Sequence, residues 1–507
     1  MYVRTIQRRN KDGSVVRYLQ LAHNERTASG QVVARVIHSL GREDQVDREA
    51  LQRLVRSISR FLEPSEQLAA SAPEELGFVG SWPLGGGWVL DRLWRRLGID
   101  AAIGRLAAGR RVAGAVERLL FALVCNRALE PCSKRAAVEW AREDVCLPGV
   151  EQVGSDPQVF YRAMDFLLAA AEEIQREVFF SVANLLNLEV DVIFFDTSST
   201  YFEIEDEDES DGEQGAGGLR RFGESKDRRP DLPQVVVGLA VTREGIPVRC
   251  WVFAGNTSDQ VLVRQVKDDL RSWKLNRVLW VLDTGFASEE NRRYLQRAGG
   301  HYILGEKLRA GHANLEALAR ISDELAALAR KRTAEDRRDA EALLQAHPTI
   351  GRYLTRRAGR LVVDQRKVKA EERLDGKFLL TSSDDTLPAE EIALGYKQLL
   401  EVERGWRTMK HTLDLRPVYH RKDERIRAHV LLCFLALLLT RVIEVTTGQT
   451  WPAVRRELQR LHLGEFQGSA GRVLQRTQTT PAQHQILQAL QIQEPPRFLT
   501  IEPAQAA

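Results

Sequence analysis

The stretch Val192-Ile-Phe-Phe-Asp196-Thr-Ser-Ser199 decides the expected class of the fold. Its run of consecutive apolar residues is typical of a central strand that is covered on both faces of a sheet. A second run of this kind, Val278-Leu-Trp-Val-Leu282, is followed by Asp283-Thr-Gly. Each buried strand is expected to end at its aspartate, and carboxylates at the ends of neighbouring strands can meet at one edge of a sheet. The pattern predicts an α/β core with two acidic side chains at one edge.

Further strands are expected around these two. The segments Val235–Thr242 and Pro247–Phe253 have the composition of paired strands on either side of a turn at 243–246. The segment Phe378–Thr381 is expected to rejoin the same sheet much later in the chain. Between the first strand and the hairpin, residues 203–218 are acidic and then glycine-rich, which predicts an exposed loop.

The composition is that of a folded, multidomain protein. The chain has 507 residues, too many for one compact core, and 43% of them are hydrophobic and 28% charged. The formal net charge is only +3, from 73 basic and 70 acidic residues, so charge alone argues weakly for a polyanionic partner. The five cysteines show no CxxC spacing, which favours reduced thiols in a cytoplasmic protein.

Neither a secretory signal nor a membrane span is expected. The N-terminal residues lack the apolar core of a signal peptide. The longest apolar run, Val430–Leu439, is about half as long as a membrane span requires, so we expect a buried helix there and no membrane partner.

Changes in pattern along the chain predict five parts. Residues 2–40 include short alternating runs at Val15–Leu21 and Val32–Ile37, and a helix is expected from Arg48 to Phe61. Residues 85–186 are helical in pattern, and the segment Leu361–Val368 returns to a strand pattern. The expected layout is a basic β module with one helix at 1–75, an all-α scaffold at 76–188, a catalytic core at 189–300 and 379–447, an α+β insertion at 301–378, and a C-terminal helix and tail at 448–507.

The segment Tyr396–Lys410 is expected to form one continuous helix. At 100° per residue, one face of roughly 120° carries a single acid, Glu403, among basic and aromatic side chains, namely Tyr396, Trp406, Arg407 and Lys410. Glu401 is rotated by about 200° and points away, beside Arg404. An ordinary solvated helix with Glu and Arg pairs is the alternative.

Asp196, Asp283 and Glu403 together suggest a metal site. Oxygen ligands without histidine or cysteine suit Mg²⁺ or Mn²⁺, and three carboxylates can hold two such ions. Two ions could activate a water or a 3′-hydroxyl in phosphodiester displacement. For each aspartate alone, the alternative is a strand-end cap or an ion-pair partner.

Basic and aromatic residues near Glu403 are the candidate DNA contacts. Tyr396, Arg407 and Lys410 are placed to hold a polyanion. Trp406 either stacks on an unpaired base or packs in the core. His420 and His429 follow closely, and we expect them to be structural.

Several motifs resemble bacterial insertion-sequence transposases of the DDE type. They are Asp-Thr-Ser-Ser-Thr-Tyr-Phe-Glu at 196–203, Gly-Glu-Ser-Lys-Asp-Arg-Arg-Pro-Asp-Leu-Pro-Gln-Val at 223–235, Gly-Ile-Pro at 245–247, Gly-Asn-Thr-Ser-Asp at 255–259 and Asp-Thr-Gly-Phe at 283–286. The pattern Tyr396-x2-Leu399-x3-Glu403-x6-Lys410 resembles the signature around that family's third acid. Leu399 stands where the signature usually carries arginine, and Arg404 and Arg407 are candidates to replace it.

The resemblance implies a fold and a reaction. It implies an RNase H-like mixed-sheet core of the IS-four-like superfamily, with a β-containing insertion before the third acid and with Asp196, Asp283 and Glu403 as metal-binding triad. Such enzymes use Mg²⁺, cut double-stranded DNA at transposon ends, join the 3′-hydroxyl to target DNA, and act as dimers or larger synaptic complexes. Two alternatives stay open: a nuclease that shares the core but cannot join DNA, and a non-catalytic DNA-binding relative.

Overall fold

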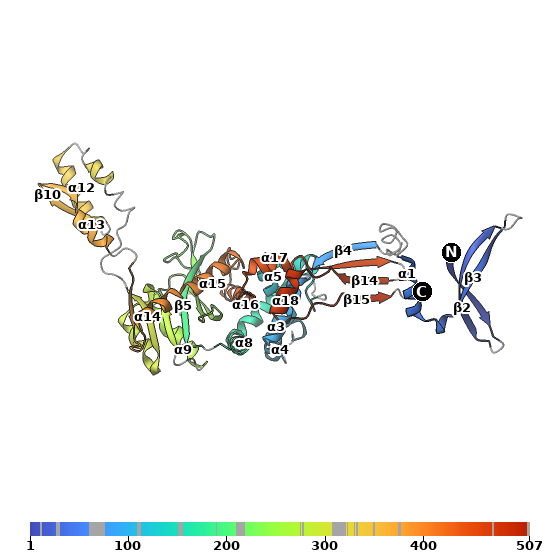
Figure 1. The fold of residues 1–507 in the computed structure, drawn as a ribbon. Helices are drawn as coiled ribbons and strands as arrows, with labels where there is room; N and C mark the ends of the chain where they lie inside the picture. The colour runs from blue at the N-terminus through green and yellow to red at the C-terminus, as the bar shows by residue number, and fades with distance from the viewer. Residues whose placement is uncertain are drawn as a thin grey trace. The chain divides into compact units, whose positions relative to one another are not determined.

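The computed structural model describes most of the chain (Figure 1). The described residues are 1–10, 13–26, 31–59, 77–108, 113–150, 156–188, 190–208, 218–273, 275, 278–306, 321, 323–328, 330, 333–347, 350–373, 377–468 and 471–503. They fall into two compact units. One comprises Met1–Val79, Glu465–Val473 and Thr500–Ala507, and the other comprises Gly80–Gly464 and Leu474–Leu499.

The N-terminal strands form the expected small sheet. Strands β1 (Tyr2–Arg9), β2 (Val15–Arg26) and β3 (Val32–Arg42) pair antiparallel in that order. Helix α1 (Arg48–Ser59) follows, and the last two residues of the expected helix lie outside the described part. The predicted strands and helix are therefore confirmed.

A six-stranded mixed sheet carries both candidate aspartates. Its order is β12-β9-β8-β5-β6-β7, with β5 (Val192–Tyr201), β6 (Gln234–Val241), β7 (Pro247–Ala254), β8 (Leu279–Leu282), β9 (His301–Glu306) and β12 (Leu379–Ser382). Strand β8 runs parallel to β5 and β9, and the other pairs are antiparallel. The hairpin β6–β7 and the return of β12 were predicted. Strand β9, however, belongs to this sheet, although its residues were assigned to the insertion.

Both faces of this sheet are buried, which explains its continuous apolar strands. On one face Phe194 and Leu239 join a large core that includes the helical part of the chain. On the other face Phe195 and Trp251 pack against α9 (Asp259–Arg271) and α10 (Glu289–Leu295). Successive side chains of β5 thus point into different cores, as the alternation along a strand requires.

The helical pattern of residues 85–186 is confirmed. The helices are α3 (Gly85–Arg96), α4 (Ile99–Ala107), α5 (Ala113–Leu129), α6 (Lys134–Glu139), α7 (Pro157–Ala169) and α8 (Ala171–Leu185). They share their core with α16 (Asp423–Thr447), which packs against α5, α7 and β7. Among the described helices, α16 alone is long and apolar enough to cross a membrane. Because 83% of its most apolar window is buried inside the protein, this is weak evidence for a span.

Two other regions differ in part from expectation. In the insertion, β10 (Leu354–Arg357) pairs with β11 (Arg360–Val363), and α12 (Ala334–Ala346) and α13 (Gln365–Glu372) flank them, so the strand expected up to Val368 ends earlier. The C-terminal stretch contains more than the one expected helix. It forms α17 (Trp451–Leu458), β13 (His462–Gly468), β14 (Gly471–Arg476), α18 (Pro481–Ala489) and β15 (Phe498–Pro503), and its strands join β4 (Gly77–Pro83) in the order β15-β14-β13-β4.

Candidate active site

Asp196 and Asp283 lie side by side on neighbouring parallel strands. The last paired residues of β5 and β8 are Phe195 and Leu282, and each aspartate comes directly after one of them. The prediction that both strands end there is correct only for β8. Strand β5 continues to Tyr201 because its other edge stays paired with β6, where Asp196 faces Leu239. Asp196 therefore sits on a rigid strand, at the point where its parallel neighbour stops.

A lysine and a third aspartate complete the surroundings of Asp196. Lys226 Nζ lies 3.7 Å from Asp196 Oδ1 and 3.1 Å from Asp259 Oδ2. It also donates to the Thr197 carbonyl oxygen at 2.9 Å. Thr197 Oγ1 in turn donates to Asp259 Oδ1 at 2.5 Å. One ammonium group thus bridges two carboxylates in a partly buried position.

Burial and the neighbouring charges shift the pKa of Asp196. Burial raises its pKa to about 6, and the negative charges of Asp259 and Asp283 act in the same direction, while Lys226 opposes them. Carboxylates that are crowded and poorly hydrated favour any cation that can reach them. The raised pKa therefore marks a place where positive charge is stabilised.

Asp283 is held by a tyrosine from another helix. Tyr396, near the end of α14 (Ala389–Lys397), donates its hydroxyl to Asp283 Oδ1 at 2.8 Å. Burial and this bond both raise the pKa of Tyr396. Gly305 of β9 makes the approach possible, since a Cβ there would lie 2.5 Å from the Tyr396 hydroxyl and 2.9 Å from Thr284 Oγ1.

The continuous helix expected from Tyr396 to Lys410 is wrong. Helix α14 ends at Lys397 and α15 (Leu400–His411) begins after a break at Gln398 and Leu399. Leu399 is buried, so the break allows it to face the core. Tyr396 and Glu403 consequently lie on separate helices, which are joined by two residues with right-handed helical backbone angles.

Glu403 lies on α15 and is exposed. Within the described residues, no hydrogen bond or ion pair joins it to Asp196 or Asp283. Its helix nevertheless passes close to Asp196: a Cβ on Gly405 would lie 3.0 Å from Leu239, the cross-strand partner of Asp196. Glu401 points away, as predicted, and pairs with Arg404 at 2.6 Å and with Arg441 at 3.3 Å.

The three predicted ligands are not assembled into one cluster. In the described part of the chain, no group of three or more Asp, Glu, His or Cys side chains lies close enough to hold a metal ion. The donor set around Asp196 and Asp283 still fits a hard cation, because it consists of carboxylate oxygens and already attracts the Lys226 ammonium group. The structure thus brings two of the three acids together and leaves the third on an adjacent helix.

Two family models match the chain. The model of the N-terminal domain of IS1634 family transposases matches residues 3–70, and the transposase DDE domain matches residues 223–439. The chain belongs to the insertion-sequence DDE transposases. The matched DDE span contains Asp283 and Glu403 and begins after Asp196. Its family implies a DNA-cleaving enzyme that uses a divalent metal ion, with DNA as its partner.

Other comparisons add little to this identification. No curated protein sequence matches the transposase. A solved piggyBac transposase synaptic complex with hairpin DNA aligns over 74% of this chain and 78% of that chain, at 10% identity. The TM-score of 0.35 does not establish a shared fold.

Several side chains that were predicted to bind DNA have protein partners in this transposase. Lys410 Nζ donates to Asp227 Oδ1 at 2.7 Å, and Arg416 lies 2.9 Å from the same oxygen. Burial lowers the pKa of Lys410, and the Asp227 carboxylate opposes that shift. Trp406 is buried with an Nε1 that has no hydrogen-bond partner, so core packing is the alternative that the structure supports.

Arg404 and Arg407 remain on the surface of the transposase. Both are exposed, and together with His411 and Arg441 they line a hollow between α15 and α16. His429 is the satisfied structural histidine that was expected, bonded through Nε2 to the Leu415 carbonyl at 3.1 Å.

The sequence reasoning assigned no role to Lys226, Asp227 or Asp259, which the structure places at or beside the site. All three lie in the segments 223–235 and 255–259 that carry the family resemblance. Their position in those motifs was the available signal, but no residue spacing shows that a lysine from a loop reaches two aspartates.

Proposed function

We propose that this DNA transposase cleaves at transposon ends and joins the 3′-hydroxyl to target DNA, with Asp196, Asp283 and Glu403 as ligands of Mg²⁺ or Mn²⁺. The observation that carries this proposal is the pair of aspartates that directly follow Phe195 and Leu282 on neighbouring parallel strands. Burial, together with the charges of Asp259 and Asp283, raises the pKa of Asp196 to about 6. The support for Glu403 is that its helix, α15, packs against β5 and β6, the strands that carry Asp196 and its cross-strand partner Leu239. In this proposal Glu403 moves towards the two aspartates when metal and DNA bind.

The divalent ions would supply charge stabilisation at the phosphate and lower the pKa of an attacking water or 3′-hydroxyl. The protein residues have different tasks. Tyr396 fixes the orientation of the Asp283 carboxylate through its hydroxyl. Lys226 holds Asp196 near Asp259 before DNA arrives. Such preorganised groups reduce the cost of aligning the reacting atoms.

The DNA backbone is proposed to lie against the exposed side of α15. Arg404 and Arg407 offer guanidinium groups to phosphate there. Lys410 and Tyr396 contact DNA only after they exchange Asp227 and Asp283 for phosphate oxygens. Arg407 is therefore proposed as the first contact, and the side chains that are paired within the protein, including Arg404 with Glu401, follow.

The decisive experiment replaces each acid separately by its neutral isostere. Asp196→Asn, Asp283→Asn and Glu403→Gln are each expected to reduce Mg²⁺-dependent cleavage by about 100-fold or more, since each removes several kcal/mol of transition-state stabilisation. The substrate is a duplex copied from the flanks of the reading frame. Glu401→Gln is the matched control, because Glu401 lies on the same helix and pairs with Arg404 and Arg441.

Retained cleavage in any one of the three variants would remove that residue from the proposed triad. A second assay separates the reactions, since a 3′-end that is cut but never joined to a second duplex would identify a nuclease. Absence of any metal-dependent cleavage on the correct ends would favour a non-catalytic DNA-binding relative.

The proposed assembly is a homodimer or larger complex that holds two DNA ends in the cytoplasm. The support is the family of the DDE domain alone. Light scattering of the transposase with and without end duplexes tests it: a monomer in both conditions would contradict the assembly.

A further inference from the structure

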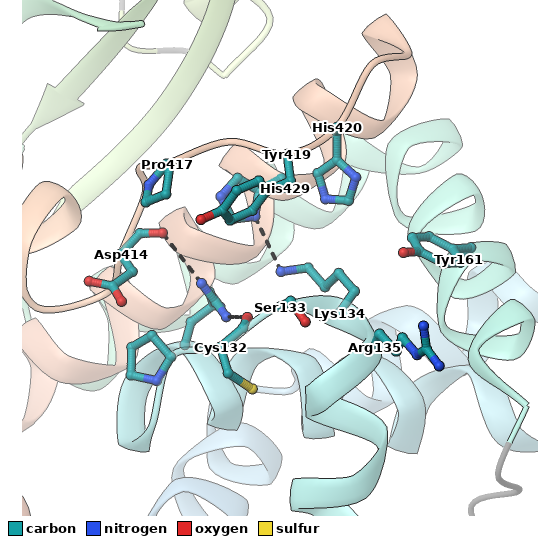
Figure 2. Close-up of a pocket in the computed structure, with 12 residues that line it drawn as sticks. Cys132, Ser133, Lys134, Arg135, Tyr161, Asp414, Pro417, Tyr419, His420 and His429 are labelled. Carbon is teal, nitrogen blue, oxygen red and sulfur yellow. Dashed lines mark hydrogen bonds between the residues drawn. The ribbon is translucent and has the colours of Figure 1, made fainter. Parts of the chain in front are cut away.

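A basic cavity of about 510 Å³ lies outside the acidic site (Figure 2). It is bounded by α5, α6, α7, α16 and the loop that follows α15, with Tyr161 and Tyr419 among its lining residues. Tyr419 is 78% exposed at its mouth. Its size is in the range of small-ligand sites.

A buried lysine points into this cavity. Lys134 is only 5% exposed, and Figure 2 shows its side chain directed towards His429. Lys134 Nζ lies 3.3 Å from His429 Nδ1, and the other ring nitrogen faces the Leu415 carbonyl. His429 must donate to that carbonyl, so its Nδ1 accepts from Lys134 and the ring is neutral. The described residues provide no carboxylate within ion-pair distance of Lys134.

A second buried cation lies beside it. Arg127 is 3% exposed, and it donates to the Asp414 carbonyl at 3.3 Å, to Asn126 Oδ1 at 2.8 Å and to the Cys132 carbonyl. Its Nε has no partner. Every acceptor of Arg127 in the described residues is therefore neutral.

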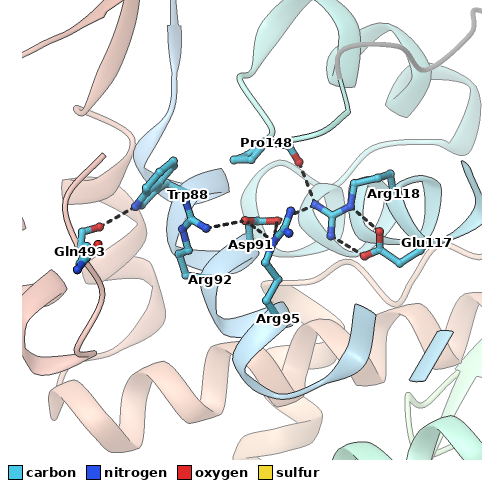
Figure 3. Close-up of polar contacts among 8 residues, drawn as sticks. All are labelled: Trp88, Asp91, Arg92, Arg95, Glu117, Arg118, Pro148 and Gln493. Carbon is cyan, nitrogen blue, oxygen red and sulfur yellow. Dashed lines mark hydrogen bonds and ion pairs between the residues drawn. The ribbon is translucent and has the colours of Figure 1, made fainter. Parts of the chain in front are cut away.

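Elsewhere in the same helical bundle a partly buried arginine is neutralised by carboxylates. Arg118 lies 2.6 Å from Asp91 and 2.5 Å from Glu117, and Arg95 also reaches Asp91 (Figure 3). Because an unpaired buried charge is costly, such pairing is the usual arrangement. Lys134 and Arg127 depart from it, although they line a cavity that is open to solvent.

We propose that this cavity binds a phosphate group, with Lys134 and Arg127 as its cationic contacts. The proposal rests on the function proposed above, in which the natural source is a DNA phosphodiester. The alternative source of the same chemistry is a free nucleotide or inorganic phosphate. Tyr161 and Tyr419 would then flank the sugar or base next to the bound phosphate.

The loop beside the cavity also reaches the helix of Glu403. Asp414 accepts from Arg127, and Arg416 shares the Asp227 carboxylate with Lys410 at the end of α15. A phosphate that draws Arg127 towards it acts on the same loop. Occupancy of the cavity is thus coupled to α15 through Asp414 and Arg416 of this connection.

The test uses the full-length transposase without divalent metal, so that it does not depend on strand cleavage. Melting temperature is followed during titration with potassium phosphate, with potassium chloride at matched ionic strength as reference. End-duplex affinity is measured across salt concentrations in parallel. Lys134→Met is compared with Lys267→Met, because Lys267 likewise donates to neutral acceptors, the Tyr294 and Leu295 carbonyls, but lies in another part of the fold.

The expected result is that phosphate raises the melting temperature of wild type and of Lys267→Met but not of Lys134→Met. If DNA supplies the phosphate, Lys134→Met also weakens binding of the end duplex roughly tenfold. It then reduces the slope of log affinity against log salt concentration by about one. Unchanged DNA binding with a lost phosphate response assigns the cavity to a free phosphate compound. No phosphate response in wild type together with unchanged DNA binding in Lys134→Met overturns the proposal.

A second variant tests the same site if Lys134→Met does not fold. Arg135→Gln changes an exposed residue at the rim of the cavity. It is expected to weaken the phosphate response severalfold with an unchanged melting temperature in chloride. If Lys134→Met does not fold and Arg135→Gln keeps the full phosphate response, the result counts against the site.

Discussion

At the scale of single residues, Lys226 places a positive charge among carboxylates that are proposed to bind metal. Its ammonium group lies near both Asp196 and Asp259, so it supplies charge compensation in the absence of a metal ion. The same position makes it a competitor of an incoming divalent cation. Lys226 thus links the stability of the free protein to its affinity for metal.

We predict that Lys226→Met lowers the melting temperature in the absence of metal and increases the stabilisation produced by Mn²⁺. The carboxylates lose their internal cation, and an added ion then relieves more repulsion. Calorimetric melting with and without Mn²⁺ measures both effects, with Lys226→Arg as the charge-preserving control. A smaller Mn²⁺ effect in Lys226→Met than in wild type would contradict this account.

Trp406 and Arg407 are neighbours in sequence with opposite environments, and they make a matched pair. Trp406→Ala is expected to destabilise the protein by about 3–5 kcal/mol, since it removes a large buried side chain. Arg407→Ala is expected to change stability by less than about 0.5 kcal/mol and to weaken DNA binding. Urea unfolding measures the change in stability of each variant, and end-duplex binding measures the change in DNA affinity. A Trp406→Ala variant that stays stable but has lost DNA binding would favour stacking of Trp406 on a base.

At the scale of elements, the contact between α14 and β9 positions one of the proposed ligands. The Tyr396 hydroxyl reaches Asp283 only because Gly305 has no Cβ at that point of β9. The break between α14 and α15 places Tyr396 and Glu403 on separate helices. Helix α14 therefore supplies a hydrogen-bond donor to Asp283, and α15 carries Glu403.

We predict that Gly305→Ala destabilises the protein by about 1–3 kcal/mol, because its methyl group would overlap the Tyr396 hydroxyl. Tyr396→Phe removes that hydroxyl, so the double variant should be destabilised by less than the sum of the single variants. Urea unfolding of the four proteins measures this coupling. Strictly additive effects would show that Gly305 and Tyr396 do not interact.

At the scale of the whole molecule, one core joins the helical region to the sheet that carries the aspartates. Helix α16 packs against α5, α7 and β7, and its residues belong to the same core cluster as Phe194 of β5. Lys134 is buried within this assembly, next to Arg127 of α5 and the neutral His429 of α16. Its protonation therefore affects the unfolding equilibrium of the folded unit.

We predict that unfolding free energy rises with pH between about 7 and 10 through Lys134. Burial, followed by the charge of Arg127, lowers the pKa of this lysine from 10.5 to about 7 in the folded state, while nearby Cys132 and Cys433 oppose the shift weakly. The unfolded chain binds the extra proton in this window, so stability increases as pH rises and is lost as pH falls towards 7. The nearby His420, with a pKa lowered to about 4 mainly by burial, does not titrate there.

Urea unfolding from pH 7 to 10 tests this prediction against Lys134→Met. The variant lacks the titrating amine, so its curve should be flatter and its stability near pH 7 higher than that of wild type. An equal pH slope in both proteins would assign the titration to other groups.

The sequence by itself determined the buried strands, the helical scaffold and the aspartate that follows each of two apolar runs. Those features depend on local periodicity and on runs such as Val192–Phe195, which can bury both faces only in a covered sheet. It also carried the family signal, through motifs that are contiguous in the chain. Glu401 was correctly separated from Glu403, because helical rotation is a local property.

Only the tertiary structure decided how remote segments meet. The break before α15 includes the buried Leu399 and was not indicated by the local pattern, which predicted one continuous helix. The partners of Lys226 and Lys410 lie on other elements, so spacing in the sequence does not reveal them. The surroundings of Lys134 are also decided by packing. In the described structure its ammonium group lies beside His429 and has no carboxylate within ion-pair distance, which the composition of the chain does not reveal.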